Sequence, residues 1–135
     1  MTPLQPYDPP DPDLAMLAWL AAPGVTVLPE RPADLLARVP LLLITPIPAS
    51  SPHPGLHDRA IYNVQTIHTS RKKARDLLTG ARARLWSAWH HQTPAGGLVL
   101  NQVREDEGPN QVTSGLPDGL WRWSATWAVS LQTVR

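Results

Sequence analysis

The histidines are the residues best suited to bind a metal ion, and the 135-residue chain contains five of them. His53 and His57 are spaced as "HPGLH", but Pro54 and Gly55 exclude the helix that would aim both rings at one ion. His68 stands apart from this pair, and neither a carboxylate cluster nor a cysteine completes a ligand set. The sequence therefore predicts no metal site and no cofactor.

Residues able to act as nucleophiles or as general acids and bases lack the spacing that catalysis needs. The chain has no "GxSxG" elbow, no P-loop, no "GxGxxG" and no "HExxH". It has no cysteine, which excludes disulfides and thiol nucleophiles. One acidic run, "EDE", adjoins a predicted loop, where carboxylates are more often solvated than paired for acid–base work: Glu105, Asp106 and Glu107. We therefore predict that the protein is not an enzyme.

A basic cluster opposes the local electrostatics of the helix that carries it. The stretch "SRKKAR" places four cations in the first turns of that predicted helix: Arg71, Lys72, Lys73 and Arg75. Each costs a few tenths of a kcal/mol at the positive end of the helix dipole. Three interpretations of the cluster are open. It is a solvated face, or it binds acidic groups of a partner, such as residues 105–107 of the next copy. The third interpretation is a contact with nucleic acid. The net charge of +1 and the lack of interleaved aromatic residues count against nucleic acid.

The last strand, predicted over residues 120–134, separates two kinds of side chain. Three of the six tryptophans lie on one side: Trp121, Trp123 and Trp127. Because the chain has no phenylalanine, we expect these rings to lie under the helices and to supply aromatic bulk to the core. Arg122 begins the other, polar side. A strand of roughly 50 Å is longer than most. We therefore expect its polar side to join copies of the chain, unless a bulge or the stem of the preceding loop takes up part of the length.

Two main helices are predicted. The first spans residues 12–22, with Asp11 as its cap and a Pro-Gly pair after its end. It is apolar nearly all round, so more than one of its sides must be covered. The second spans residues 70–91 and carries the basic cluster at its start. Trp86 flanks the buried stripe of this helix, either as the rim of the core or as an interface anchor.

Five stretches are predicted as strands: residues 25–28, 41–47, 58–68, 98–106 and 120–134. The second is apolar on both sides, which is typical of a central strand, and Pro46 and Pro48 are expected to end its pairing. A short helical turn is predicted between residues 31 and 40. This order predicts an α+β fold, a four- or five-stranded mixed sheet with two main helices packed on one face and a long C-terminal strand. The loops over residues 49–58 and 107–119 are expected to face partners.

The length and composition predict one domain. Residues 13–135 suffice for a core without disulfides. Residues 1–12 hold five prolines and are predicted to form an extended arm, which is either frayed or docked on a neighbouring subunit. The most apolar run, residues 14–22, is too short to cross a bilayer, and acidic residues precede it where a signal peptide would be basic. We expect a soluble protein made in a reducing cytoplasm.

Three stretches of the chain resemble one protein family. "PADLLARVPLLLITPI" is similar to that family's prolines before an apolar strand. "GLHDRAIYNVQTIHTSRKKARDLLTGARARL" is similar to its strand that passes through a polar turn into a helix rich in Ala, Arg and Leu. "GPNQVTSGLPDGLWRWSATWAVSLQTVR" is similar to its glycine–proline loop and long terminal strand. The family is the tail-terminator proteins, which are written among the minor tail proteins, of bacteriophages with long non-contractile tails.

The resemblance implies a structural virion protein without catalysis. Members of the family close into a six-fold ring on the last ring of the tail tube, stop its polymerisation, and present the other face to head-completion or connector proteins. It further implies a place at the head-proximal end of the tail, assembly in the host cytoplasm, no membrane partner, and DNA only in passage through the lumen. The basic cluster, the acidic run, Trp86 and Arg122 are then candidate contacts with another subunit or with the tube.

Other functions stay open on the sequence alone. The nearest alternative is another neck component, a head-completion or connector protein of similar size. A small nucleic-acid-binding or regulatory module could use the basic start of the second helix. A small hydrolase is the third alternative, and the missing motifs count against it.

Overall fold

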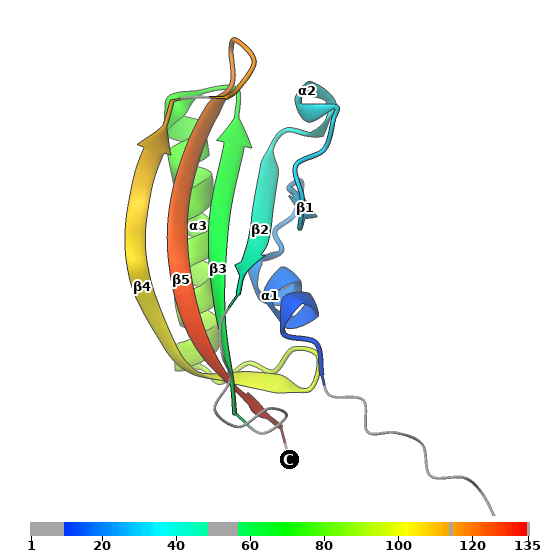
Figure 1. Ribbon diagram of the computed structural model, residues 1–135, viewed down its shortest axis with the longest axis vertical. Coiled ribbons are helices and arrows are strands. Elements are labelled where there is room, and N and C mark those ends of the chain that lie inside the picture. Colours follow the sequence, from blue (N-terminus) through cyan, green and yellow to red (C-terminus); the bar gives the residue numbers. More distant parts are fainter. Residues whose placement is uncertain (1–9, 49–56, 114, 135) are drawn as a thin grey trace, which may run out of the picture.

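The computed structural model describes residues 10–48, 57–113 and 115–134, so most of the predicted arm and of the 49–58 loop lies outside the described residues. Along this part the elements are α1 (Pro12–Leu20), β1 (Thr26–Leu28), α2 (Leu35–Arg38), β2 (Leu41–Ile47), β3 (His57–His68), α3 (Arg71–His90), β4 (Leu98–Val112) and β5 (Trp121–Thr133). The strands form one sheet in the order β1-β2-β3-β5-β4, with β1 parallel to β2 and the other neighbours antiparallel. The two main helices, α1 and α3, pack on one face of this sheet (Figure 1). The predicted α+β fold class is confirmed.

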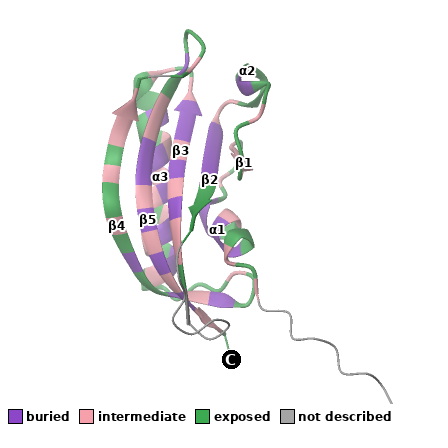
Figure 2. Cartoon of the chain, viewed as in Figure 1, coloured by how far each residue is buried: buried purple, intermediate pink, exposed green. Residues whose placement is uncertain are grey.

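The main core lies between α3 and the sheet. α3 presents a stripe of buried side chains at helical spacing: Ala74, Leu78, Ala81, Leu85 and Ala88. β5 presents four side chains from alternate positions, each at most 2% exposed: Ala125, Trp127, Val129 and Leu131. Figure 2 shows this alternation of buried and less buried residues along β3 and β5. The long terminal strand therefore belongs to the centre of the fold, as its period-two pattern predicted.

The prediction that all three tryptophans of the last strand lie under the helices is wrong for Trp121. Trp127 is 0% exposed and Trp123 is half-buried, whereas Trp121 is 39% exposed. Trp121 pairs with His68 at the end of β3. The first buried residue of α3 is Ala74, and the three helical residues before it are charged. The first turn of α3 therefore offers this indole no apolar cover.

The opposite face of the sheet is partly covered within the subunit, although its polar pattern had suggested a surface left for other copies. A second, smaller cluster packs on it: Leu35, Leu41, Leu43, Ile67 and Leu120. α2 supplies Leu35, and the β4–β5 connection supplies Leu120. Farther along this face, Asn63 Nδ2 donates to Ser124 Oγ at 2.9 Å, and Ser124 is 6% exposed. The polar side of β5 is thus used in part inside its own subunit.

β4 is longer than predicted. It ends at Val112 rather than at Asp106, and the loop after it shortens accordingly. Three register shifts interrupt its pairing with β5, the last of them between Glu107 and Asn110. Such bulges take up extra residues, so the strand passes a glycine–proline pair that would otherwise end the ladder. The composition "EGPNQV" looks like a loop, but pairing with the long β5 outweighs its local preference.

Two predicted element ends also move. α1 ends at Leu20 rather than at Ala22, because Ala21 is already extended just before the Ala22–Pro23 bond, which disfavours helix. Pro46 does not end the pairing of β2, since it stays in register with Tyr62 of β3. β1 pairs only with the first three residues of β2, so Pro46 lies where β2 is the edge of the sheet, a position that tolerates proline.

α1 is covered by α3 and by β2, which agrees with the prediction that more than one of its sides must be covered. Four of its residues are buried: Ala15, Met16, Trp19 and Leu20. Two long-range hydrogen bonds hold the helix in place, from Tyr62 Oη to Asp13 Oδ1 at 2.7 Å and from the Trp19 indole to the Thr93 carbonyl at 2.8 Å. Leu14, however, is 62% exposed. Among the described residues, nothing covers this apolar side chain on the outward side of α1.

Truncating Trp127 and Trp121 should have unequal effects on stability. Trp127→Ala removes a fully buried ring and is expected to lower the free energy of unfolding by about 3–5 kcal/mol. Trp121→Ala removes a partly exposed ring and should cost less than about 1.5 kcal/mol. Urea unfolding followed by circular dichroism measures both values. Equal losses would contradict the different placement of the two indoles.

Candidate functional site

The basic cluster lies on the exposed first turns of α3. Ser70 Oγ accepts a hydrogen bond from Lys73 N at 3.1 Å and caps the helix. All four basic side chains are exposed: Arg71, Lys72, Lys73 and Arg75. Within the described residues only one of them forms an ion pair, Lys72 with Asp76 at 3.5 Å. The structure thus brings the four cations together as the sequence predicted, and the fold makes almost no use of their charge.

The exposed indole of Trp121 lies near these cations. Trp121 is the direct partner of His68 across the β3–β5 ladder. Burial, together with the positive charge of Lys73, lowers the pKa of His68, which places Lys73 close to the same end of the sheet. The start of α3 therefore combines positive charge with an exposed aromatic ring.

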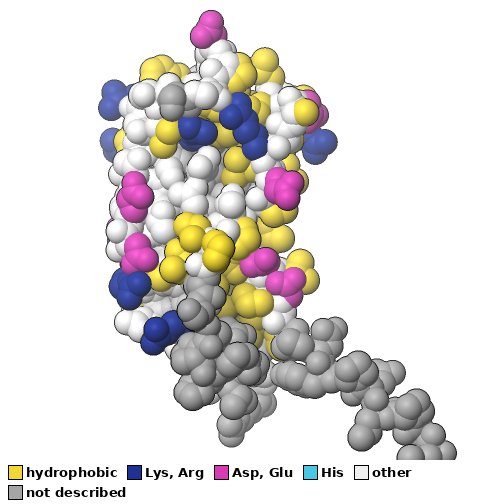
Figure 3. Space-filling view, viewed as in Figure 1, with side chains coloured by type: hydrophobic (Ala, Val, Ile, Leu, Met, Phe, Trp, Pro, Cys, Tyr) yellow, Lys and Arg dark blue, Asp and Glu magenta, His cyan; other side chains and the backbone are white. Residues whose placement is uncertain are grey.

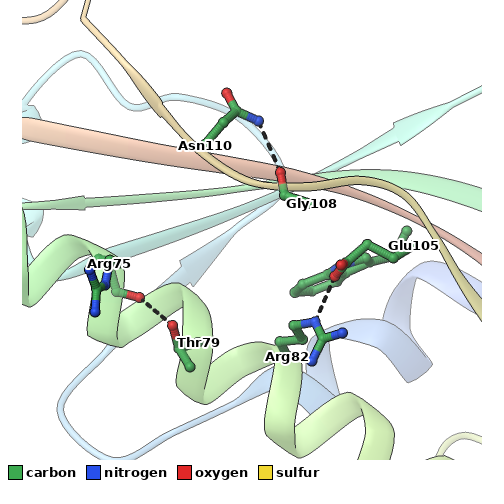
Figure 4. A network of polar contacts seen from close by, with 7 residues as sticks. Arg75, Thr79, Arg82, Glu105, Gly108 and Asn110 are labelled. Carbon is green, nitrogen blue, oxygen red and sulfur yellow. Dashed lines mark hydrogen bonds and ion pairs between the residues drawn. The ribbon is translucent and has the colours of Figure 1, made fainter.

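Glu105 points into its own subunit. Its Oε2 accepts hydrogen bonds from Arg82 Nε at 2.6 Å and from Trp127 Nε1 at 3.0 Å. Figure 4 shows the first contact bridging α3 and β4. The Arg82 guanidinium also lies over the Trp86 ring, 4.4 Å from its centroid, and Trp86 meets Trp127 edge to face with centroids 5.9 Å apart. These contacts favour Trp86 as the rim of the core over an interface anchor.

The rest of the acidic run does not join Glu105 in one surface. Asp106 Oδ1 accepts from Arg104 Nε at 2.6 Å, and Glu107 Oε1 accepts from Asn110 Nδ2 at 2.9 Å. A register shift separates Glu105, which pairs with Trp127, from Glu107, which pairs with the adjacent Thr126. Adjacent positions of β5 face opposite sides of the sheet, so the two glutamates do as well. The run, which the sequence offered as one possible partner of the basic cluster, is thus divided between the two faces of the sheet.

Arg122 lies on the polar side of β5, where it pairs with Ile67 of the second cluster. The side chain is half-buried, and burial together with the charge of Arg31 lowers the pKa of Arg122.

In residues 10–48, 57–113 and 115–134, no group of three or more histidine, aspartate or glutamate side chains could hold a metal ion. No helix of these ranges is long and apolar enough to cross a membrane.

A groove between α1 and β2 was not singled out by the sequence. Its volume is about 370 Å³, and its lining is mixed: Asp13, Leu17, Pro29, Glu30, Ile44, Thr45 and Pro46. The space-filling view shows hydrophobic and acidic side chains side by side over α1 and the neighbouring edge of the sheet (Figure 3). We call it the α1–β2 groove. The signal that could have indicated it is the all-round apolar pattern of α1, which leaves Leu14 exposed in the part of the chain that the structure describes.

Removing the carboxylate of Glu105 should destabilise the subunit. Glu105→Ala leaves the Arg82 guanidinium and the Trp127 indole N–H without their shared acceptor, so we expect a loss of about 2 kcal/mol in the free energy of unfolding. The matched control Asp106→Ala breaks a more exposed ion pair and should cost less than about 1 kcal/mol. Urea unfolding measures both. A loss for Glu105→Ala no larger than for the control would show that the subunit does not depend on this carboxylate.

Neutralising Lys73 should raise the pKa of His68, because the positive charge of Lys73 is the second cause, after burial, that lowers it. An NMR titration of the His68 imidazole in Lys73→Gln measures the change. Lys72→Gln is the matched control and should leave the pKa of His68 where it is. The same titration curve in both variants and the unaltered chain would contradict the placement of Lys73.

A family model described as "Phage tail termination protein" matches residues 10–135 of the chain. A comparison with curated proteins finds no match. The matched range includes both core clusters, the start of α3, the α1–β2 groove and the whole of β5. It agrees with the resemblance that the sequence itself shows. The chain therefore belongs to the phage tail termination protein family, a family of structural proteins rather than enzymes.

Proposed function

We propose that the protein closes into a ring of six copies that caps the head-proximal end of the tail tube and ends tube polymerisation. The observation that carries the proposal is the family match over residues 10–135. Membership of the family implies association with the tail tube and a place in the virion. The resemblance of three stretches of the sequence to the tail-terminator proteins supports the six-fold ring.

Termination by a ring requires two unlike ring faces. One face must match the last ring of tube protein, and the other must offer the tube protein no matching surface, so that no further ring adds. Such a ring is closed by contacts between two different surfaces of each subunit. The subunit has unlike surfaces available, because α1 and α3 cover one face of the sheet while α2 and polar side chains occupy the other.

The ring face turned away from the tube is proposed to receive the head-completion or connector proteins. Residues 49–58 and the connection between β4 and β5 are candidate partner-facing segments, since loops can vary without disturbing the sheet. The lumen has to pass DNA without holding it, so we expect the residues that line it to avoid strong positive charge.

A phage that lacks this protein should produce abnormally long tails, because nothing then stops the addition of tube subunits. Electron microscopy of lysates measures the distribution of tail lengths, and a copy of the gene supplied in trans should restore the normal length. Tails of normal length that fail to join filled heads would contradict a terminator and indicate a connector protein instead.

A further inference from the structure

The α1–β2 groove has an apolar floor that continues onto the surface. Leu17 lines the groove, and Leu14, three residues earlier on the same helix, is 62% exposed. Exposed apolar surface that adjoins a groove and carries charge at its rim is typical of a protein–protein contact.

The carboxylates at the groove lack a cation. Among the described residues, neither Asp13 nor Glu30 forms an ion pair. The opposite situation holds at the start of α3, where Arg71, Lys73 and Arg75 are exposed and form no ion pair within the same ranges. One subunit thus carries an acidic surface and a basic surface, and no ion pair among the described residues balances either charge.

A single subunit cannot bring these two surfaces together. α1 meets the second half of α3, where Arg84 Nη2 donates to the Leu20 carbonyl at 3.1 Å. Arg71 lies thirteen residues earlier on α3, which is roughly 20 Å along the helix axis. Figure 1 shows the start of α3 at the end of the sheet away from α1. The complementary surfaces can therefore meet only between copies.

Trp121 supplies an apolar anchor on the basic side. It is 39% exposed at the start of β5, beside the first turn of α3. Tryptophan and arginine are the residues most enriched at the energetic centres of protein interfaces. The basic surface thus pairs positive charge with an exposed ring, and the groove pairs negative charge with an apolar floor.

We propose that the start of α3 and Trp121 of one copy dock in the α1–β2 groove of the next copy. The cations then face Asp13 and Glu30, and the indole covers the apolar surface of α1. The contact joins two different surfaces, so its repetition yields a closed ring when the rotation closes. The inference rests on the proposed function and names the subunit contact that the ring uses. The acidic run at residues 105–107 is not the partner surface, because Glu105 and Asp106 already bind arginines of their own subunit.

A charge exchange tests the contact. Purified full-length chain is mixed with tail tubes, and capped tube ends are counted by electron microscopy. Glu30→Arg alone, and Arg71→Glu with Lys73→Glu, should each reduce capping about tenfold or more, because like charges then face each other. Glu30→Arg with both helix changes should restore it, since the charges are exchanged rather than removed. Asp106→Arg, an equal change on an exposed residue that the proposed contact does not use, is the matched control and should cap normally.

The outcomes separate this contact from the proposed function. Normal capping by every single-sided variant, or no rescue in the combined variant while the control caps, overturns the docking contact and leaves the terminator function standing. Failure of the unaltered chain to cap tubes or to oligomerise overturns both. Circular dichroism should give the same spectrum for all variants, because the substituted side chains are exposed.

Cross-linking gives an independent readout. The natural chain has no cysteine, so Thr45→Cys with Arg71→Cys introduces one thiol on each side of the contact. A short bismaleimide should join the capped assembly into a ladder that ends at a discrete closed species. The control pair, Thr45→Cys with Ser87→Cys, moves the second thiol to the far end of α3 and should give no ladder. A ladder from the control pair alone would overturn the contact.

Discussion

The burial of β5 beneath α3 is the constraint on which the rest of the subunit depends. Trp127 is 0% exposed, its ring packs edge to face on Trp86, and its indole N–H donates to Glu105. Because Glu105 also binds Arg82, one tryptophan connects β5, β4 and α3. This arrangement replaces the phenylalanine core that many domains of this size use, and it leaves β5 no freedom to shift its register without exposing the ring.

The same arrangement decides which surfaces other molecules can use. The central strands have neighbours on both sides, and the second cluster covers part of the polar face. Within the described residues, Leu14 on the outward side of α1 lacks apolar cover, and Arg71, Lys73 and Arg75 at the start of α3 lack ion-pair partners. Cations at a helix N-terminus cost stability in an isolated subunit. A feature that opposes local preference without a gain inside the subunit is expected at a contact with another molecule.

Much of the fold followed from the sequence, because long periodic segments carry strong signals. The helix over residues 71–90, the apolar strand over residues 41–47 and the alternation of β5 were all predicted close to their observed bounds. The division of the acidic run could not be predicted, since a bulge decides which face each carboxylate takes. The exposure of Trp121 depends on where α3 begins to cover the sheet, and the α1–β2 groove joins segments about thirty residues apart. Both are tertiary properties that no local pattern records.

The most direct measurement is an electron cryo-microscopy reconstruction of the head-proximal end of the tail. We predict a closed ring of copies of this chain, in which the start of α3 of each copy lies in the α1–β2 groove of the next and Trp121 is covered. Copies present singly at that end, or a ring whose members meet through other surfaces while the groove and the cations stay in solvent, would contradict the central claim.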